Sequence, residues 1–171
     1  METWDAIRSR RNVRVYEDRP LSPEELDRIA EAGWRSPSAQ NLQRWDFVLS
    51  TDRSQLQALS GIWRGAGHLA GAAAAIVMVA PVTEEARIRQ LIEYDLGQAT
   101  MAMMLAAADL GIGSGHSSVG DQAEARRILA VPEDRFCAYM LALGRPADRP
   151  LRPIQRPDRR PFDEVVHRGA W

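Results

Sequence analysis

The sequence predicts a single domain in which helices pack on a β-sheet, and three observations carry this prediction. The chain has 171 residues, 45% of them apolar and 26% charged, as in an ordinary folded domain with one core. Residues 73–80 are apolar at every position, which is typical of a central strand covered on both faces. Residues 83–110 follow with the spacing of a long helix. A sheet with helices on it is the expected result.

The first two helices are predicted from their start signals. Thr3 can cap a short amphipathic helix that runs to about Ser9. Ser22 begins a stronger signal, because a proline follows at the first helical position and Glu25 stands three residues after the cap. This second helix should run to about Trp34.

Irregular backbone and a strand should come next. Residues 36–41 combine a proline with serine and asparagine side chains that compete for backbone hydrogen bonds. Trp45, Phe47 and Leu49 then alternate with Asp46, Val48 and Ser50, which predicts a strand.

The second half of the chain predicts a long helix, a turn, a short helix and a strand. Residues 83–110 are so rich in alanine and methionine that the helix is either central core or a subunit interface. We interpret the glycines of residues 111–115 as a turn, with His116 at its mouth. Asp121 can cap a further helix, and residues 136–143 are typical of a second buried strand.

The last segment differs from the rest of the chain. Residues 145–161 contain five prolines and six arginines, and Phe162, Val165, Val166 and Trp171 follow. Such an arm cannot fold on itself, so its apolar end needs a surface on its own subunit or on a partner. We therefore expect one domain over residues 1–144 and a C-terminal arm over residues 145–171 that packs on a partner subunit.

Composition excludes several classes of function. The 22 basic side chains are all arginine and nearly balance 23 acidic ones, so no positive field exists to hold nucleic acid or an anionic membrane. Because the chain has no lysine, it cannot form a lysine Schiff base with a substrate or cofactor. It also cannot form the type of phosphate-binding loop that uses a lysine.

The residues also argue against metal sites and secretion. Cys137 is the only cysteine and lies in an apolar segment, where a thiol is usually inert, and the three histidines lie far apart in the sequence. A disulfide and a bound metal are therefore not expected. The longest apolar run, residues 69–81, is shorter than the ~20 residues of a membrane span, and no leader opens the chain. We expect a cytoplasmic protein.

Two segments could bind a ligand. The basic segment, residues 8–14, is suited to one small anion, because the guanidinium groups of Arg10 and Arg11 can grip a phosphate. The alternative is a solvated helix end paired with nearby carboxylates. In residues 37–45, the side chains of Ser38, Gln40, Asn41 and Gln43 could orient a flat ligand in an apolar slot. The alternative there is a set of caps around a proline turn.

Five motifs in order resemble those of the FMN-dependent nitroreductases, over nearly the whole chain. They are the opening arginine motif at Arg10–Arg14, the PSxxNxQPW signature at Ser36–Trp45, the start of the long central helix at Asp95–Gly97, the glycine-serine turn at Gly111–Ser114, and the last strand and closing arm at Leu143–Pro146 and Arg159–Val166. The resemblance implies an α+β three-layer sandwich, with a central, mostly antiparallel sheet flanked by helices, in an interlocked homodimer.

The resemblance also implies the cofactor and its contacts. Two FMN sites would lie at the dimer interface, each built from both subunits. Arg10, Arg11, Asn12 and Arg159 would hold the phosphate and ribityl chain. The other subunit's Pro37, Ser38, Ala39 and Asn41 would line the flavin ring, and Gly113, Ser114, Gly115 and His116 would lie near its edge.

The implied activity is that of a flavin oxidoreductase. NAD(P)H would deliver a hydride to the flavin, and a nitroaromatic, a quinone or a similar small acceptor would then enter the same slot, in a ping-pong mechanism without a catalytic triad. The alternatives are a flavin or small-ligand binding protein without turnover, and a protein whose arginines dock an acidic partner.

The sequence departs from the family pattern at several positions. Members often place one lysine near the flavin ring and another in the arm, whereas this chain has none. Arg64 is a candidate replacement for the first lysine, and Pro157 stands at the second position. Arg44 replaces a proline, and Asn12 replaces a serine. The chain also lacks the helical insertion that covers the pocket in longer members, which predicts a more open site.

Overall fold

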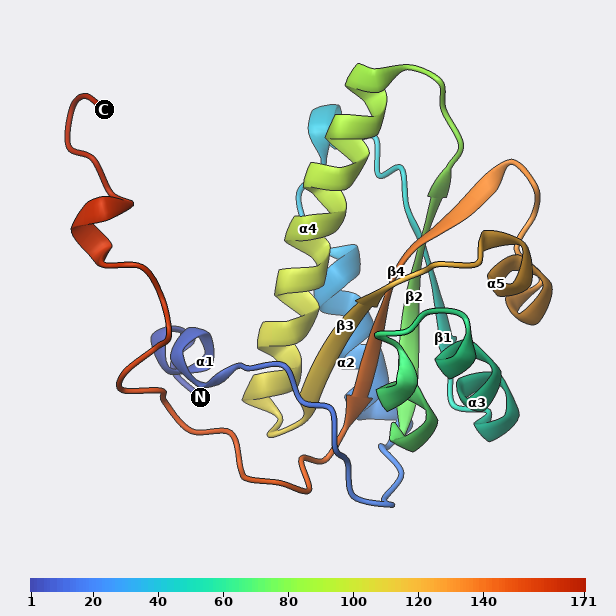
Figure 1. Ribbon diagram of the computed structural model, residues 1–171, viewed down its shortest axis with the longest axis horizontal. Coiled ribbons are helices and arrows are strands. Elements are labelled where there is room, and N and C mark those ends of the chain that lie inside the picture. The colour runs from blue at the N-terminus through green and yellow to red at the C-terminus, as the bar shows by residue number, and fades with distance from the viewer.

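The computed structural model describes residues 1–171 and shows a sheet between two layers of helices (Figure 1). The strands are β1 (Asp46–Ser50), β2 (Ala74–Pro81), β3 (Gly113–Ser118) and β4 (Arg135–Gly144). They form one four-stranded sheet in the order β1-β2-β4-β3, and every neighbouring pair is antiparallel. The predicted α+β architecture is confirmed.

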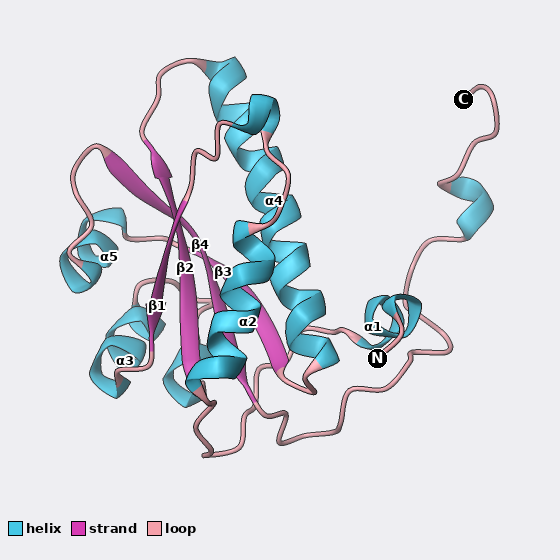
Figure 2. Cartoon of the chain, turned by 180° about the vertical axis from the view of Figure 1, so that it is seen from behind, coloured by secondary structure: helices cyan, strands magenta, loops and turns pink.

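The helices divide between the two faces of the sheet. Helices α2 (Pro23–Trp34) and α4 (Ala86–Asp109) cover one face, and α3 (Arg53–Gly61), α5 (Gln122–Leu129) and the 3-10 helix η2 (Gly67–Gly71) cover the other. The short helix α1 (Thr3–Ser9) packs against α4. Figure 2 shows the same layers from behind.

The buried strand β2 explains why the sheet needs helices on both sides. Its side chains alternate between two cores, with Ile76 and Met78 facing α2 and α4, and Val77 and Val79 facing α3 and α5. All four are almost completely buried. The prediction for residues 73–80 is confirmed.

The start of α2 is confirmed and the predicted cap of α1 is wrong. The Ser22 hydroxyl accepts a hydrogen bond from the Glu25 amide, and the Glu25 carboxylate accepts one from the Ser22 amide, which makes a complete capping box. Helix α1, however, begins at Thr3, and its N-cap Glu2 makes no side-chain hydrogen bond. Thr3 is therefore the first helical residue rather than the cap.

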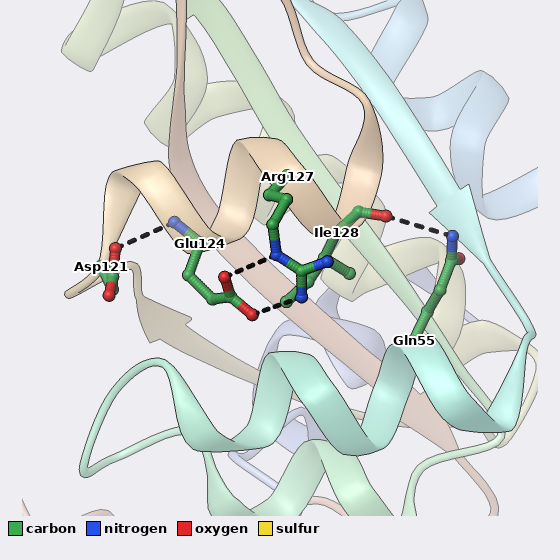
Figure 3. A network of polar contacts seen from close by, with 5 residues as sticks. All are labelled: Gln55, Asp121, Glu124, Arg127 and Ile128. Atoms are coloured by element: carbon green, nitrogen blue, oxygen red, sulfur yellow. Dashed lines mark hydrogen bonds and ion pairs between the residues drawn. The ribbon is translucent and has the colours of Figure 1, made fainter.

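Two short helices lie side by side on the second face. Asp121 accepts a hydrogen bond from the Glu124 amide at 2.9 Å and so caps α5 as predicted. Glu124 also forms a two-point ion pair with Arg127. The Gln55 side chain of α3 reaches the Ile128 carbonyl of α5 (Figure 3). Helix α3, which the sequence analysis does not predict, is capped by the Asp52 side chain.

The interpretation of residues 111–115 as a turn is wrong for most of them. Only Gly111, with φ +70°, has turn geometry. Residues 113–118 form the edge strand β3, and His116 lies in the middle of it, opposite Leu141 of β4. Glycine is tolerated in this strand because another stretch of backbone crosses it closely, as described below.

The remaining segments are irregular. The 3-10 helix η1 (Ala39–Asn41) follows α2, and the 3-10 helix η3 (Phe162–Glu164) lies near the C-terminus. None of the helices combines the length and the hydropathy of a membrane span.

Candidate functional site

The candidate site lies at the free edge of β3. Strand β3 pairs with β4 on one side, and on the other side the chain that leaves α1 crosses it. Asn12 forms a parallel bridge with Ser114, and the Val13 amide donates to the Ser114 carbonyl at 2.8 Å. A Cβ on Gly113 would lie 2.7 Å from the Val13 side chain, and one on Gly115 would collide with the Val13 carbonyl oxygen. The two glycines therefore permit this close crossing.

The crossing brings together most of the residues that were predicted to hold the phosphate and to lie near the edge of the flavin ring. Arg10 follows α1 directly, Asn12 pairs with β3, and Gly113–His116 form the strand itself. A cavity of about 420 Å³ opens beside them, between α4 and the sheet. Its lining comprises Arg10, Glu93, Gly97, Thr100, Met101, Met104, His116 and Tyr139. The cavity thus combines an apolar wall with a basic end, as a ligand with an anionic group requires.

The positive charges at this end have no carboxylate partners. Arg10 and Arg14 form no ion pair, and the Nε atom of Arg10 is buried without any hydrogen-bond partner. An unpaired buried donor costs free energy, about 1–3 kcal/mol for a neutral group and more for a charged one. The site is therefore suited to a phosphate or a similar anion, which would satisfy this donor.

Arg11 points to a different neighbour. Its guanidinium donates to the Asp148 carboxylate at 2.6 Å and to the Arg149 carbonyl at 2.7 Å. This contact holds the pKa of Asp148 below its usual value. Arg11 therefore fastens the first part of the C-terminal arm to the body of the molecule.

Two histidines flank the edge strand on its opposite faces. His116 projects toward α4 and lines the cavity, whereas the Nε2 atom of His68, from η2, lies 3.1 Å from the Gly115 carbonyl oxygen. Partial burial lowers the pKa of His116, and the nearby charges of Arg10, Arg14 and His68 lower it further. A neutral imidazole is thus favoured when no anion is present.

His68 is a residue that the sequence analysis names only as one of three scattered histidines. The structure brings it to the candidate site because η2 packs under β3. Arg64, the candidate replacement for a family lysine, is exposed and stacks on the Trp63 ring, with 5.4 Å from its guanidinium carbon to the ring centroid. The side chain that reaches Gly115 is instead the imidazole of His68.

The second predicted group, Pro37, Ser38, Ala39 and Asn41, lies elsewhere in the chain. It packs against the N-terminal half of α4, where the Ala39 amide donates to the Asp95 carboxylate at 3.0 Å. None of these four residues lines the Arg10 cavity, which runs along Glu93, Gly97, Thr100 and Met104 of the same helix. One copy of the chain therefore does not bring the two groups together.

The loop of this second group is held in an unusual backbone conformation. Gln40, Asn41 and Gln43 all have positive φ, at 55°, 56° and 47°, which is strained for residues other than glycine. The Ser38 hydroxyl accepts a hydrogen bond from the Gln43 amide at 3.0 Å. The nearly buried Asp95 carboxylate accepts one from the Ala39 amide. Asp95 thus holds this loop in place, a role that the sequence analysis missed.

Arg159 lies in the exposed part of the arm. The last hydrogen bonds between arm and body join Ile154 to the Arg8 carbonyl and Gln155 to the Arg8 side chain. Beyond them the arm runs away from the body (Figures 1 and 2), and every residue from 156 to 171 is exposed. The Arg159 guanidinium donates only to the Asp158 carbonyl.

No group of three or more histidine, cysteine, aspartate or glutamate side chains is placed to hold a metal ion. Cys137 is buried in β4, where burial raises its thiol pKa. The chemistry of the site therefore depends on what its arginines and glycines can bind.

The chain is similar to known proteins over most of its length. The model of the nitroreductase family matches residues 7–65 and 61–145. A protein of Archaeoglobus fulgidus, named provisionally as an NADH dehydrogenase/NAD(P)H nitroreductase, is 33% identical over 174 residues, which cover 99% of each chain. An oxygen-insensitive NADPH nitroreductase of Salmonella typhimurium is 27% identical, over 99% of this chain and 74% of its own.

A solved structure extends the likeness to the fold. The FMN-dependent nitroreductase of Clostridium difficile superposes with a TM-score of 0.84 at 24% identity, over 97% of this chain and 98% of its own. The family model covers most of the chain, and the archaeal relative matches it from end to end. The chain therefore belongs to the nitroreductase family of oxidoreductases.

Proposed function

We propose that the protein is an NAD(P)H-dependent flavin oxidoreductase that uses FMN and reduces a nitroaromatic, a quinone or a similar small acceptor. The observation that carries the proposal is the unpaired positive charge beside the glycine-lined edge of β3. Arg10 has a buried donor without a partner, and neither Arg10 nor Arg14 is neutralised by a carboxylate. The names of the relatives, among them an FMN reductase of Bacillus subtilis, support flavin chemistry.

The residues of this chain divide the binding between them. Arg10 would hold the FMN phosphate through charge-assisted hydrogen bonds, and Asn12 and the backbone of Gly113–Gly115 would border the ribityl chain and ring edge. Arg11 already bonds to Asp148, so we assign it the task of fixing the arm rather than a direct phosphate contact.

We further propose that the working unit is a homodimer. Pro37, Ser38, Ala39 and Asn41 lie apart from the Arg10 cavity within one chain, and they would line the ring in the site of a second copy. The exposed arm, which carries Arg159, would pack on that copy, and the apolar side chains of the arm would then be buried. Phe162 is 67% exposed and Trp171 fully exposed in the single chain, and such exposure favours a partner surface.

When bound, FMN would accept a hydride from NAD(P)H and pass electrons to the acceptor. The chain needs no nucleophile or acid–base triad for this, and it supplies position, charge and a pocket. One open cavity would admit NAD(P)H and the acceptor in turn, which predicts ping-pong kinetics.

The test is anaerobic mixing of the purified protein with NADH or NADPH in a spectrophotometer. The proposal expects the flavin absorption to bleach with either or both nucleotides and to return when a quinone is added. If the flavin stays oxidised with both nucleotides, the proposal is contradicted and the protein binds flavin without turnover.

A further inference from the structure

We propose that His116 is a proton-linked contact for the anionic group at this site, so that FMN binds with uptake of a proton and more tightly at low pH. The inference rests on the proposed function, because it takes the FMN phosphate as the anion. Its basis is the position of one titratable imidazole beside arginines whose charge is fixed at any working pH.

The geometry places His116 where an anion held by Arg10 would feel its charge. Both side chains line the same cavity of about 420 Å³, and the His116 ring makes no hydrogen bond to another protein group. Its ring is therefore free to donate to a bound oxyanion. The buried Arg10 Nε, which also lacks a partner, provides a second donor at the same end of the cavity.

The surroundings of His116 leave it short of negative charge. The segment after α1 contributes Arg10 and Arg14, η2 contributes His68, and α4 contributes one carboxylate, Glu93, at the cavity lining. From β4 comes only the neutral phenol of Tyr139. Three basic groups thus act on His116 against a single acidic one.

The sign of the pH effect follows from these charges. Burial and the neighbouring cations lower the pKa of His116 in the free protein, so the ring is mostly neutral near pH 7. A dianion beside it favours the charged ring and raises that pKa. Between the two pKa values binding takes up a proton, and affinity falls as the pH rises through this window.

Release of FMN from the holoenzyme is the direct measurement. We would dilute the flavin-loaded protein into buffers from about pH 7 to 9, where the FMN phosphate with its second pKa of about 6 stays mostly dianionic, and follow the fluorescence of free FMN. One linked proton changes the dissociation constant by at most about tenfold per pH unit. We expect roughly threefold to tenfold weaker binding at pH 9 than at pH 7.

The variants decide whether His116 is the group responsible. His116→Gln should flatten the pH dependence and bind FMN with the weaker affinity at every pH, whereas Glu133→Gln, at an exposed turn outside the cavity, should keep the wild-type profile. Riboflavin, which lacks the phosphate, should bind without the decline. A decline that persists in His116→Gln, or one that riboflavin shares, would overturn the inference.

The outcome also separates this inference from the proposed function. A protein that neither carries FMN nor binds it at any of these pH values contradicts the proposed function itself. A protein that binds FMN equally well from pH 7 to 9 contradicts only the role of His116.

Discussion

Neighbouring arginines in the basic segment have different roles that the sequence does not separate. Arg11 is occupied by Asp148 and the Arg149 carbonyl, whereas Arg10 points into a cavity with an unsatisfied buried donor. Sequence reasoning could name both as phosphate ligands, because each is a guanidinium near a helix end. It could not distinguish them, since the difference depends on an arm more than 130 residues away.

The Arg10→Ala variant should lose FMN. Removing a charge-assisted phosphate contact costs roughly 1.5–3 kcal/mol, which is about a tenfold to 150-fold rise in the dissociation constant. Equilibrium dialysis of the loaded protein measures this. Arg35→Ala is the matched control, because exposed Arg35 pairs with Glu31 and stacks on the Trp34 ring, outside the cavity. Equal FMN retention in the two variants would show that Arg10 does not bind FMN.

The Asp95→Ala variant should weaken the loop that carries the second predicted group. Its carboxylate fixes the Ala39 amide, and the loop holds three strained residues in place. Losing this bond leaves a buried amide unpaired, at a cost of about 1–3 kcal/mol. Thermal unfolding should show the loss of stability, and FMN retention should fall with it. Glu133→Ala, at an exposed turn, should leave the melting temperature unchanged. An Asp95→Ala variant that melts at the same temperature as Glu133→Ala would show that the bond is not needed.

At the level of elements, β3 shows where local patterns fail. Its two glycines and three serines have low strand propensity, so the segment is typical of a turn. Pairing with β4 and the crossing of residues 12–13 outweigh that preference. By contrast, the start of α2 was predictable, because all the atoms of its capping box lie within four residues.

The Gly115→Ala variant tests the close crossing at β3. A Cβ there would collide with the Val13 carbonyl and lie 3.1 Å from the His68 ring, so the backbone must shift at a cost of about 1–3 kcal/mol. Chemical denaturation should show this loss, and FMN retention should also fall. Gly61→Ala is the control, because a Cβ there meets nothing within 4 Å. Equal free energies of unfolding for the two variants would show that the backbone at the crossing shifts without cost to accept the Cβ.

At the level of the whole molecule, a single chain leaves the proposed site incomplete. The residues around Arg10 and the loop of Ala39 contact different parts of α4, and the arm with Arg159 lies away from both. Family resemblance predicted all three groups from their motifs along the sequence. Their distances within a dimer could not be predicted, because no local pattern encodes how two copies pack.

Deletion of residues 156–171 should convert the proposed dimer to a monomer. The deleted segment makes no hydrogen bond with the body and exposes Phe162, Val165 and Trp171, so its apolar surface is available to a second copy. The rest of the chain keeps its hydrogen bonds and should stay folded by circular dichroism. Light scattering gives the mass of each form. A truncated chain that remains dimeric would show that the arm is not the interlocking element.

The central claim is that this chain holds FMN, and acid release of the chromophore from the purified protein tests it most directly. The visible absorption spectrum is recorded first, and the released compound is then identified by chromatography. The account predicts a yellow protein that releases FMN rather than another flavin. A colourless protein that added FMN neither colours nor stabilises against heat would contradict it.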